Sequence, residues 1–138
     1  MRVLLDTNVI LDFFLERTPH AEAADRLFQL AHQGKLEAYT TASSITDIYY
    51  IVARALGNNA ARNVLQNLFN LLTVIAVDGD DCIHAMGLPI SDYEDAVVVT
   101  CSLKDNIDFI VTNDTKFLSA DPTLIRVVTP NNFLSLHF

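Results

Sequence analysis

Short apolar runs alternate along this chain with longer stretches in which apolar residues recur every three or four positions. The first run, Arg2–Leu5, is ended by Asp6 and predicts a buried strand. Thr7–Arg17 follows with its apolar residues on a helical repeat, and Thr18-Pro19 stops that repeat, which predicts a helix. The sequence therefore begins with a strand and a helix joined at an aspartate.

The rest of the sequence continues this alternation. Further strands are predicted at Glu37–Thr40, Thr73–Val77, Ile107–Thr112 and Ile125–Val128. Further helices are predicted at His20–Gln33, Ser44–Leu56, Asn59–Leu72, Asp80–Met86 and Asp92–Asp105, with a helical turn at Thr115–Leu118. Strands that alternate with helices indicate an α/β fold with a mainly parallel sheet covered on both faces. We find no repeat, low-complexity tract or linker, so residues 1–138 are expected to form a single domain.

The composition indicates in which cellular compartment the protein is expected and what its cysteines can do. The longest apolar stretches, such as Leu71–Val77, are far shorter than the roughly 18 residues that cross a bilayer, and Asp6 comes too early for a secretory signal. A cytoplasmic protein without a membrane segment is expected. Two cysteines, Cys82 and Cys101, form neither a disulfide framework nor a CxxC metal motif.

The net charge of −8, from 17 acidic and 9 basic residues, argues against broad electrostatic binding to nucleic acid. Many of the acids, however, directly follow apolar, strand-like runs. Carboxylates gathered at such positions repel one another unless cations join them. The acidity therefore fits a metal site at least as well as it argues against a nucleic-acid substrate.

Two strands are each predicted to deliver an aspartate at their carboxyl end, Asp6 after the first strand and Asp114 after Ile107–Thr112. Two further acids, Asp47 and Asp95, are predicted in the first turns of helices. In parallel sheets ligands bind beyond the carboxyl ends of the strands, so these four side chains are expected to share one cleft.

Carboxylates of this kind are the hard oxygen ligands that Mg²⁺ and Mn²⁺ accept. Two such ions about 4 Å apart can activate a water and stabilise the leaving oxygen of a phosphodiester. Asn8 and Thr112, which neighbour Asp6 and Asp114, are predicted to orient the carboxylates.

Each acid also has a structural interpretation as a helix cap. Asp6 and Asp114 can cap the helices that follow them, and Ser44-x-x-Asp47 and Ser91-x-x-Glu94 fit capping boxes. Asp95 resists this interpretation, because it opens a strongly apolar helix where an unpaired charge is unfavourable.

Together these motifs resemble the PIN-domain family, which includes the VapC-type toxins of bacterial toxin–antitoxin pairs. The resemblance covers essentially the whole chain: Leu5-Asp6-Thr7-Asn8, the helix start Ser44-x-x-Asp47, Asp95-Ala96, and Thr112-Asn113-Asp114-x-x-Phe117. No single motif is specific, but their order and spacing together are.

The resemblance implies a three-layer α/β/α sandwich and a metal-dependent ribonuclease, often with an antitoxin partner and a homodimer. It places the family's acidic residues at Asp6, Asp47, Asp95 and Asp114. The second acid of the family is often Glu, so Asp47 is one methylene shorter, and Asp92 is a nearby substitute ligand.

Other functional classes fit less well. A phosphorelay receiver domain needs paired acids after the first strand and a lysine after the last, and Val128-Thr129-Pro130 lacks the lysine. A haloacid-dehalogenase phosphatase needs Asp-x-Asp where this chain has Asp6-Thr7-Asn8. A PIN-like module that has lost catalysis and only docks a partner remains the alternative.

An RNA substrate requires cations, and the candidates are few: Arg17, Arg54, Lys104 and Lys116. We expect weak, salt-sensitive binding that selects RNA shape or exposed single strands. Ile48, Tyr49, Ile51 and Val52 are a candidate apolar face for a partner helix or a second copy, and the histidines are expected on solvated helix faces or, for His137, in a terminal tail.

Overall fold

A five-stranded, all-parallel sheet with the strand order β3-β2-β1-β4-β5 forms the centre of the protein. The structure is a computed structural model in which residues 1–120 and 123–138 are described. The strands are β1 (Arg2–Leu5), β2 (Glu37–Thr41), β3 (Thr73–Ile75), β4 (Phe109–Val111) and β5 (Arg126–Val128). The predicted strands are confirmed, although β3 and β4 are shorter than the apolar runs that contain them.

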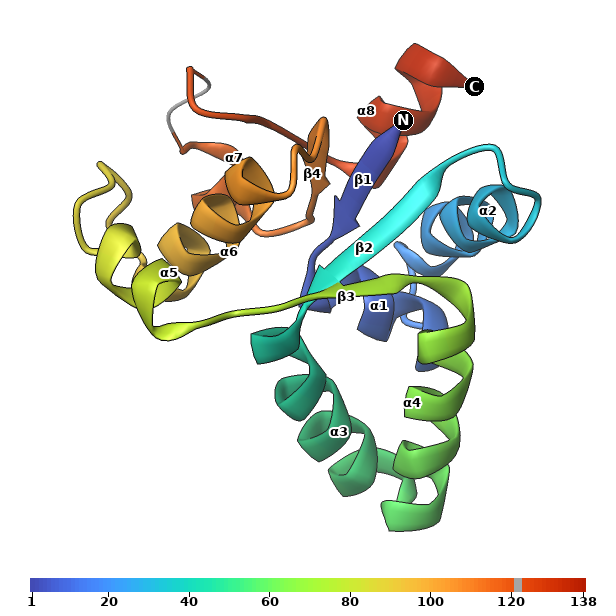
Figure 1. The fold of residues 1–138 in the computed structure, drawn as a ribbon. Coiled ribbons are helices and arrows are strands. Elements are labelled where there is room, and N and C mark those ends of the chain that lie inside the picture. Colours follow the sequence, from blue (N-terminus) through green and yellow to red (C-terminus); the bar gives the residue numbers. More distant parts are fainter. Residues whose placement is uncertain (121–122) are drawn as a thin grey trace.

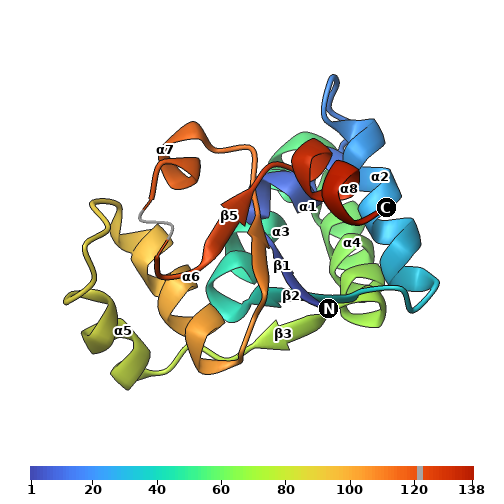
Figure 2. The same ribbon diagram turned by 90° about the horizontal axis from the view of Figure 1, so that it is seen from above.

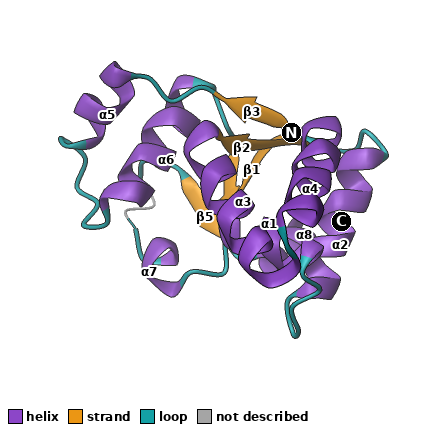
Figure 3. Cartoon of the chain, turned by 90° about the horizontal axis from the view of Figure 1, so that it is seen from below, coloured by secondary structure: helices purple, strands orange, loops and turns teal. Residues whose placement is uncertain are grey.

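Helices cover both faces of this sheet (Figures 1 and 3). One face packs against α1 (Thr7–Phe14), α2 (Ala21–His32), α3 (Ala42–Leu56), α4 (Asn58–Leu71) and α8 (Pro130–His137). The other packs against α5 (Gly79–Ala85), α6 (Tyr93–Lys104) and α7 (Thr115–Leu118). The expected α/β/α sandwich is confirmed. Figure 2 shows the two helical layers on either side of the strands.

The central strand β1 explains why the protein has two cores. Side chains alternate between the faces of a strand, so Val3 and Leu5 enter the core beneath α1–α4 and Leu4 enters the core beneath α6. All three side chains are essentially inaccessible to solvent. A strand buried on both faces has an uninterrupted apolar sequence, which is what residues 3–5 show.

The C-terminal segment differs from the prediction. Pro130–His137 forms α8, with Thr129 as the N-cap and Pro130 in the first turn, whereas His137 was expected in a terminal tail. The His137 ring lies 4.9 Å from the ring centroids of both Phe109 and Phe133, and Phe133 is fully buried. An aromatic cluster therefore holds α8 against β4.

The first helix is shorter than its periodicity predicted, because α1 ends at Phe14 and not at Arg17. Glu16 has a φ of 51°, in the left-handed region that ends a helix. The Arg17 N–H then donates to the carbonyl of Asp12 at 3.0 Å. The chain thus turns back, so that Arg17 lies beside the helix that it was expected to extend.

Strand β1 has β2 on one side and β4 on the other, so the strand order reverses there. Ligands of parallel α/β proteins bind beyond the carboxyl ends of the strands at such a reversal. A ligand site is therefore expected at the loops that follow β1 and β4. Within residues 1–120 and 123–138, no helix is both long and apolar enough to cross a membrane.

Candidate active site at the carboxyl ends of the strands

Asp6 directly follows β1 and is the N-cap of α1. Its Oδ1 accepts a hydrogen bond from the Thr7 N–H at 2.9 Å. Its Oδ2 accepts from Thr112 Oγ1 at 2.8 Å and from Asn8 Nδ2 at 3.0 Å. Burial raises the pKa of Asp6, and these hydrogen bonds oppose that rise while the charge of Asp114 adds to it. The carboxylate is therefore a helix cap and a fixed, partly desolvated acid at the same time.

Asn8 and Thr112 connect the loop after β1 to the loop after β4. Asn8 Nδ2 also donates to Thr112 Oγ1 at 2.9 Å, and Asn8 Oδ1 accepts from the Asn113 N–H at 2.9 Å. Thr112 Oγ1 in turn accepts from the Asp114 N–H at 3.0 Å, and Thr112 is fully buried. Through these contacts the two side chains fix Asp6 relative to Asp114.

Asp114 follows β4 and is the N-cap of α7, where its Oδ1 accepts from the Lys116 N–H at 3.0 Å. The capping interpretation of Asp6 and Asp114 is thus confirmed for both. Capping does not prevent either carboxylate from binding a metal ion, because the cap hydrogen bond uses only part of the acceptor capacity of its two oxygens.

Asp95 lies in the first turn of α6, half-buried at the start of a run of buried residues. Burial, together with the charges of Asp92, Asp6, Asp114 and Glu94, raises the pKa of Asp95 to about 7. The first, third and fourth acids predicted from the sequence therefore act on one another at this edge of the sheet.

The helix starts near Asp95 differ from the predicted capping boxes. Asp92, and not Ser91, is the N-cap of α6, and its Oδ1 accepts from the Asp95 N–H at 3.0 Å. Helix α3 begins at Ala42, so Ser44 is not a cap either; it is buried, with its Oγ 3.1 Å from Thr41 Oγ1. Asp47 consequently lies in the second turn of α3, exposed to solvent, and not in the first turn as predicted.

Glu94 is a further acid at this edge that is not among the residues predicted from the sequence. Partial burial raises its pKa, and so do a hydrogen bond with Asp47 and the charges of Asp47, Asp6 and Asp92. Two carboxyl groups that share a hydrogen bond need a proton or a cation between them. The sequence signal for this role is its position beside Asp95 in a first helical turn, whereas the Ser91-x-x-Glu94 pattern predicts a capping box.

In the described part of the chain, no three His, Cys, Asp or Glu side chains are already arranged to hold a metal ion. The donor set nevertheless suits a hard divalent cation, since it consists of carboxylates whose pKa values rise through burial and mutual repulsion. These residues therefore fit a divalent cation by their oxygen donors and by their negative charge.

Two of the four predicted cations lie beside these acids. Arg17 lines a pocket with Asp114, and Lys116 lines a smaller pocket with Asp92 and Asp95. Arg54 is in the last turn of α3, and Lys104, at the far end of α6, pairs with Asp81 at 2.6 Å. Arg54 and Lys104 therefore do not line the acidic edge.

A family profile described as the PIN domain matches residues 2–116, most of the chain. The chain belongs to the PIN-domain family. The resemblance inferred from the motifs around Asp6, Asp47, Asp95 and Asp114 is thereby confirmed, and the phosphorelay receiver alternative is excluded.

Individual PIN-domain relatives carry more specific names. A protein of Aquifex aeolicus named ribonuclease VapC1 is 26% identical over 137 residues, covering 96% of this chain and 92% of that protein. A DNA-bound VapBC complex from Salmonella typhimurium matches with a TM-score of 0.69 and 18% identity, over 94% of this chain and 98% of that one. VapC20 of Mycobacterium tuberculosis, a toxin that cleaves the sarcin–ricin loop, matches with a TM-score of 0.68 and 17% identity, over 83% and 92%. At these identities the structural matches establish the fold.

Proposed function

We propose that this protein is a metal-dependent endoribonuclease that hydrolyses RNA phosphodiester bonds and acts in the cytoplasm as the toxin of a toxin–antitoxin pair. The observation that carries the proposal is the set of mutually repelling carboxylates at the strand ends, among them Asp95 with its pKa of about 7. Like charges held together in the absence of a cation are characteristic of a site built for one. The 26% identical relative named as a ribonuclease supports this activity.

The residues proposed to hold Mg²⁺ or Mn²⁺ are Asp6, Asp47, Asp95 and Asp114, with Glu94 added because it shares a hydrogen bond with Asp47. A bound divalent cation would supply an activated water and stabilisation of the leaving oxygen.

The residues around the proposed ligands hold them in place. Asn8 and Thr112 donate to Asp6 Oδ2 and prevent its carboxylate from turning. The buried side of α6 excludes water behind Asp95, since Ala96–Val99 are all buried. Both effects strengthen the electrostatic interactions of the site.

The proposal is tested by incubating a mixed, structured RNA with the wild type and Asp95→Asn in Mn²⁺, Mg²⁺ or EDTA. Cleavage by the wild type alone, and only with metal, is the expected result. Asp80→Asn is the matched control, because Asp80 is an exposed acid in the first turn of another helix, α5. Absence of cleavage by the wild type in every metal would instead favour a partner-docking module without catalysis.

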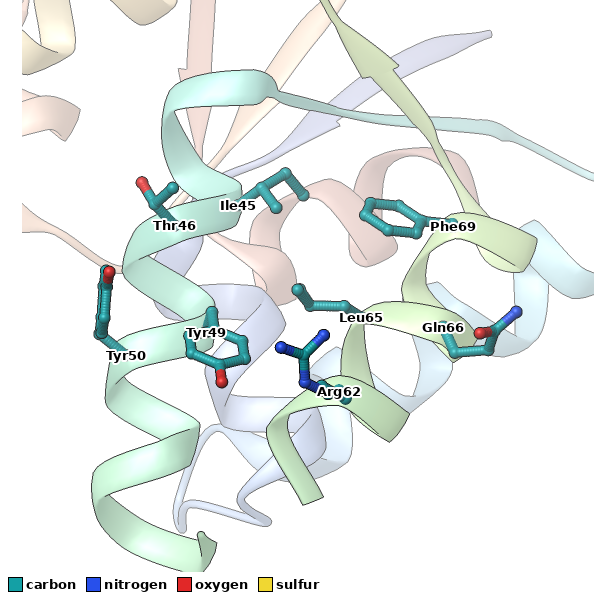
Figure 4. Close-up of a pocket in the computed structure, with 8 residues that line it drawn as sticks. All are labelled: Ile45, Thr46, Tyr49, Tyr50, Arg62, Leu65, Gln66 and Phe69. Atoms are coloured by element: carbon teal, nitrogen blue, oxygen red, sulfur yellow. The ribbon is translucent and has the colours of Figure 1, made fainter. Parts of the chain in front are cut away.

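An antitoxin partner is part of the proposal, because several structural relatives were solved as toxin–antitoxin complexes. The predicted apolar face on α3 is only partly available, since Ile48 and Val52 are buried in the core. A pocket of about 480 Å³ lies between α3 and α4 instead (Figure 4). Figure 4 shows Tyr49, Leu65 and Arg62 between the two helices.

The mostly apolar lining of this pocket suits an amphipathic antitoxin helix. Its residues are Ile45, Thr46, Tyr49, Tyr50, Arg62, Leu65, Gln66 and Phe69. Co-expression with the product of a neighbouring gene would test the pairing, and sedimentation over a wide concentration range would test the homodimer separately. A monomer at every concentration would remove self-association from the proposal.

A further inference from the structure

Beside the acidic edge lies a pocket of about 500 Å³ to which neither the fold nor the proposed metal ligands assign a role. Its lining residues are Asn8, Asp12, Arg17, Thr18, His20, Asn113 and Asp114. The volume falls within the roughly 300–1,000 Å³ of pockets that bind small molecules. Because Asp114 belongs to its wall, whatever occupies this pocket lies next to the proposed reaction site.

Arg17 is held in one orientation at the side of this pocket. Its Nε donates to Asp12 Oδ1 at 2.8 Å, and its Nη2 donates to the Asn8 carbonyl at 3.0 Å. A guanidinium has five N–H donors, so three remain after these two contacts. The Arg17 side chain is 41% exposed, which leaves it accessible to a ligand.

Asp12 is the residue that orients Arg17. Its side chain is only 5% exposed, and its second oxygen accepts from Asn113 Nδ2 at 3.1 Å. The Asn113 N–H donates to Asn8, which holds Asp6. An unbroken set of contacts thus ties the Arg17 guanidinium to the carboxylates at the strand ends. An arginine that only neutralised the buried Asp12 would not need the contacts that link Asp12, through Asn113 and Asn8, to Asp6.

We propose that Arg17 anchors a backbone phosphate of the RNA strand beside the bond that is cut, and that Asp12 is its positioning residue. A planar guanidinium with free donors binds a phosphate in a fixed geometry, and prior orientation reduces the entropy lost on binding. The strand needs such an anchor, because a protein with a net charge of −8 repels RNA elsewhere. His20, in the same pocket, offers a ring on which a base can stack.

This inference rests on the proposed function, since it takes RNA as the ligand, but it can be tested without cleavage. Binding of a fluorescein-labelled single-stranded RNA would be followed by anisotropy in Mg²⁺ between 50 and 200 mM KCl. All proteins would carry Asp95→Asn to prevent cleavage. Each phosphate neutralised on a single strand contributes about 0.7 to the slope of log Kd against log salt concentration.

Arg17→Gln is therefore expected to lower the slope by about 0.7 and to weaken binding about fivefold at 0.1 M salt. Arg54→Gln removes the same charge at the far end of α3 and should leave the slope unchanged. Asp12→Asn keeps the Arg17 charge, so it should weaken binding with little change in slope. Thermal denaturation of each variant separates these effects from loss of folding.

A purely structural ion pair gives a different pattern. Arg17→Gln and Asp12→Asn would then lower the melting temperature alike, and the slope would not change in the folded variants. That result, or failure of every variant to bind RNA at the lowest salt, would overturn the proposal. Arg17-dependent binding in these proteins, together with no cleavage by the wild type in the RNA assay above, would support the phosphate site while refuting the proposed nuclease.

Discussion

Replacing Asp95 with asparagine should stabilise the metal-free protein, although it abolishes the proposed activity. Burial and four neighbouring acids raise the pKa of Asp95 from 3.8 to about 7. The folded protein therefore binds this proton more tightly than the unfolded chain does. The resulting stability is fully present below pH 3.8 and is lost as the pH rises toward 7.

The size of the effect follows from the shift. Three pKa units at about 1.4 kcal/mol each set an upper limit of about 4 kcal/mol on the free energy of unfolding lost by pH 8. Asp95 is only half-buried, so solvent screening reduces this to about 1–2 kcal/mol. Asparagine removes the penalty but loses about 0.5 kcal/mol of favourable interaction with the N-terminus of α6. A net gain of about 1 kcal/mol, or roughly 3–5 °C in melting temperature, is expected at pH 8.

Thermal denaturation followed by far-UV circular dichroism, in EDTA at pH 5 and pH 8, measures this directly. Asp95→Asn should melt higher than the wild type at pH 8, and the difference should shrink or reverse at pH 5. Asp80→Asn, the control in the first turn of α5, should show no such pH dependence. If the variant were less stable than the wild type by the same amount at both pH values, the raised pKa of Asp95 would be refuted. The neighbouring acids would then not destabilise the charged form of Asp95.

Three further outcomes are expected. Asn8→Ala removes a donor to Asp6 and should reduce cleavage about 10- to 100-fold with the fold retained, measured by initial rates and melting temperature. Asp47→Glu lengthens the side chain by one methylene, to the residue that the family resemblance implies, and should retain metal binding, whereas Glu94→Gln should weaken it. Titration of Mn²⁺ by calorimetry tests both variants, and equal affinities would contradict the role of Glu94. Phe133→Ala should lower the free energy of unfolding by about 3–5 kcal/mol, because the Phe133 side chain of α8 is fully buried against Phe109 of β4. Urea denaturation measures this loss, and a value below about 1 kcal/mol would show that α8 does not stabilise the sheet.

Several elements could be predicted because their signals are local. An apolar run buried on both faces, as in β1, cannot be mistaken for an amphipathic element, and an acid that ends such a run lies at a strand end. Asp6 and Asp114 were located in this way. The final helix α8 was missed although its signals were also local, namely Thr129 as a cap and Pro130 in the first turn.

The other discrepancies depend on contacts between distant residues. Nothing near Asp12 in the sequence shows that Asn113, 101 positions later, donates to it. Likewise, the position of Glu94 beside Asp95 is visible in the sequence, but its contact with Asp47 depends on how α3 and α6 pack. The start of α3 was predicted two residues late, which moved Asp47 from the second turn to the first. An error of two residues at a helix start changes the turn in which an acid lies, and with it the expected distance of that acid from the edge of the sheet.

The carboxylates differ in how firmly the fold holds them, and this difference has a consequence for metal binding. Asp6 has three hydrogen bonds, including one from the buried Thr112, so its position is fixed before any cation arrives. Asp47 and Glu94 are exposed on helices and contact one another. Asp6 would therefore offer a cation a fixed ligand, whereas Asp47 and Glu94 would hold it only by exchanging it for the proton that their contact favours. Metal affinity should accordingly rise with pH as that proton is lost.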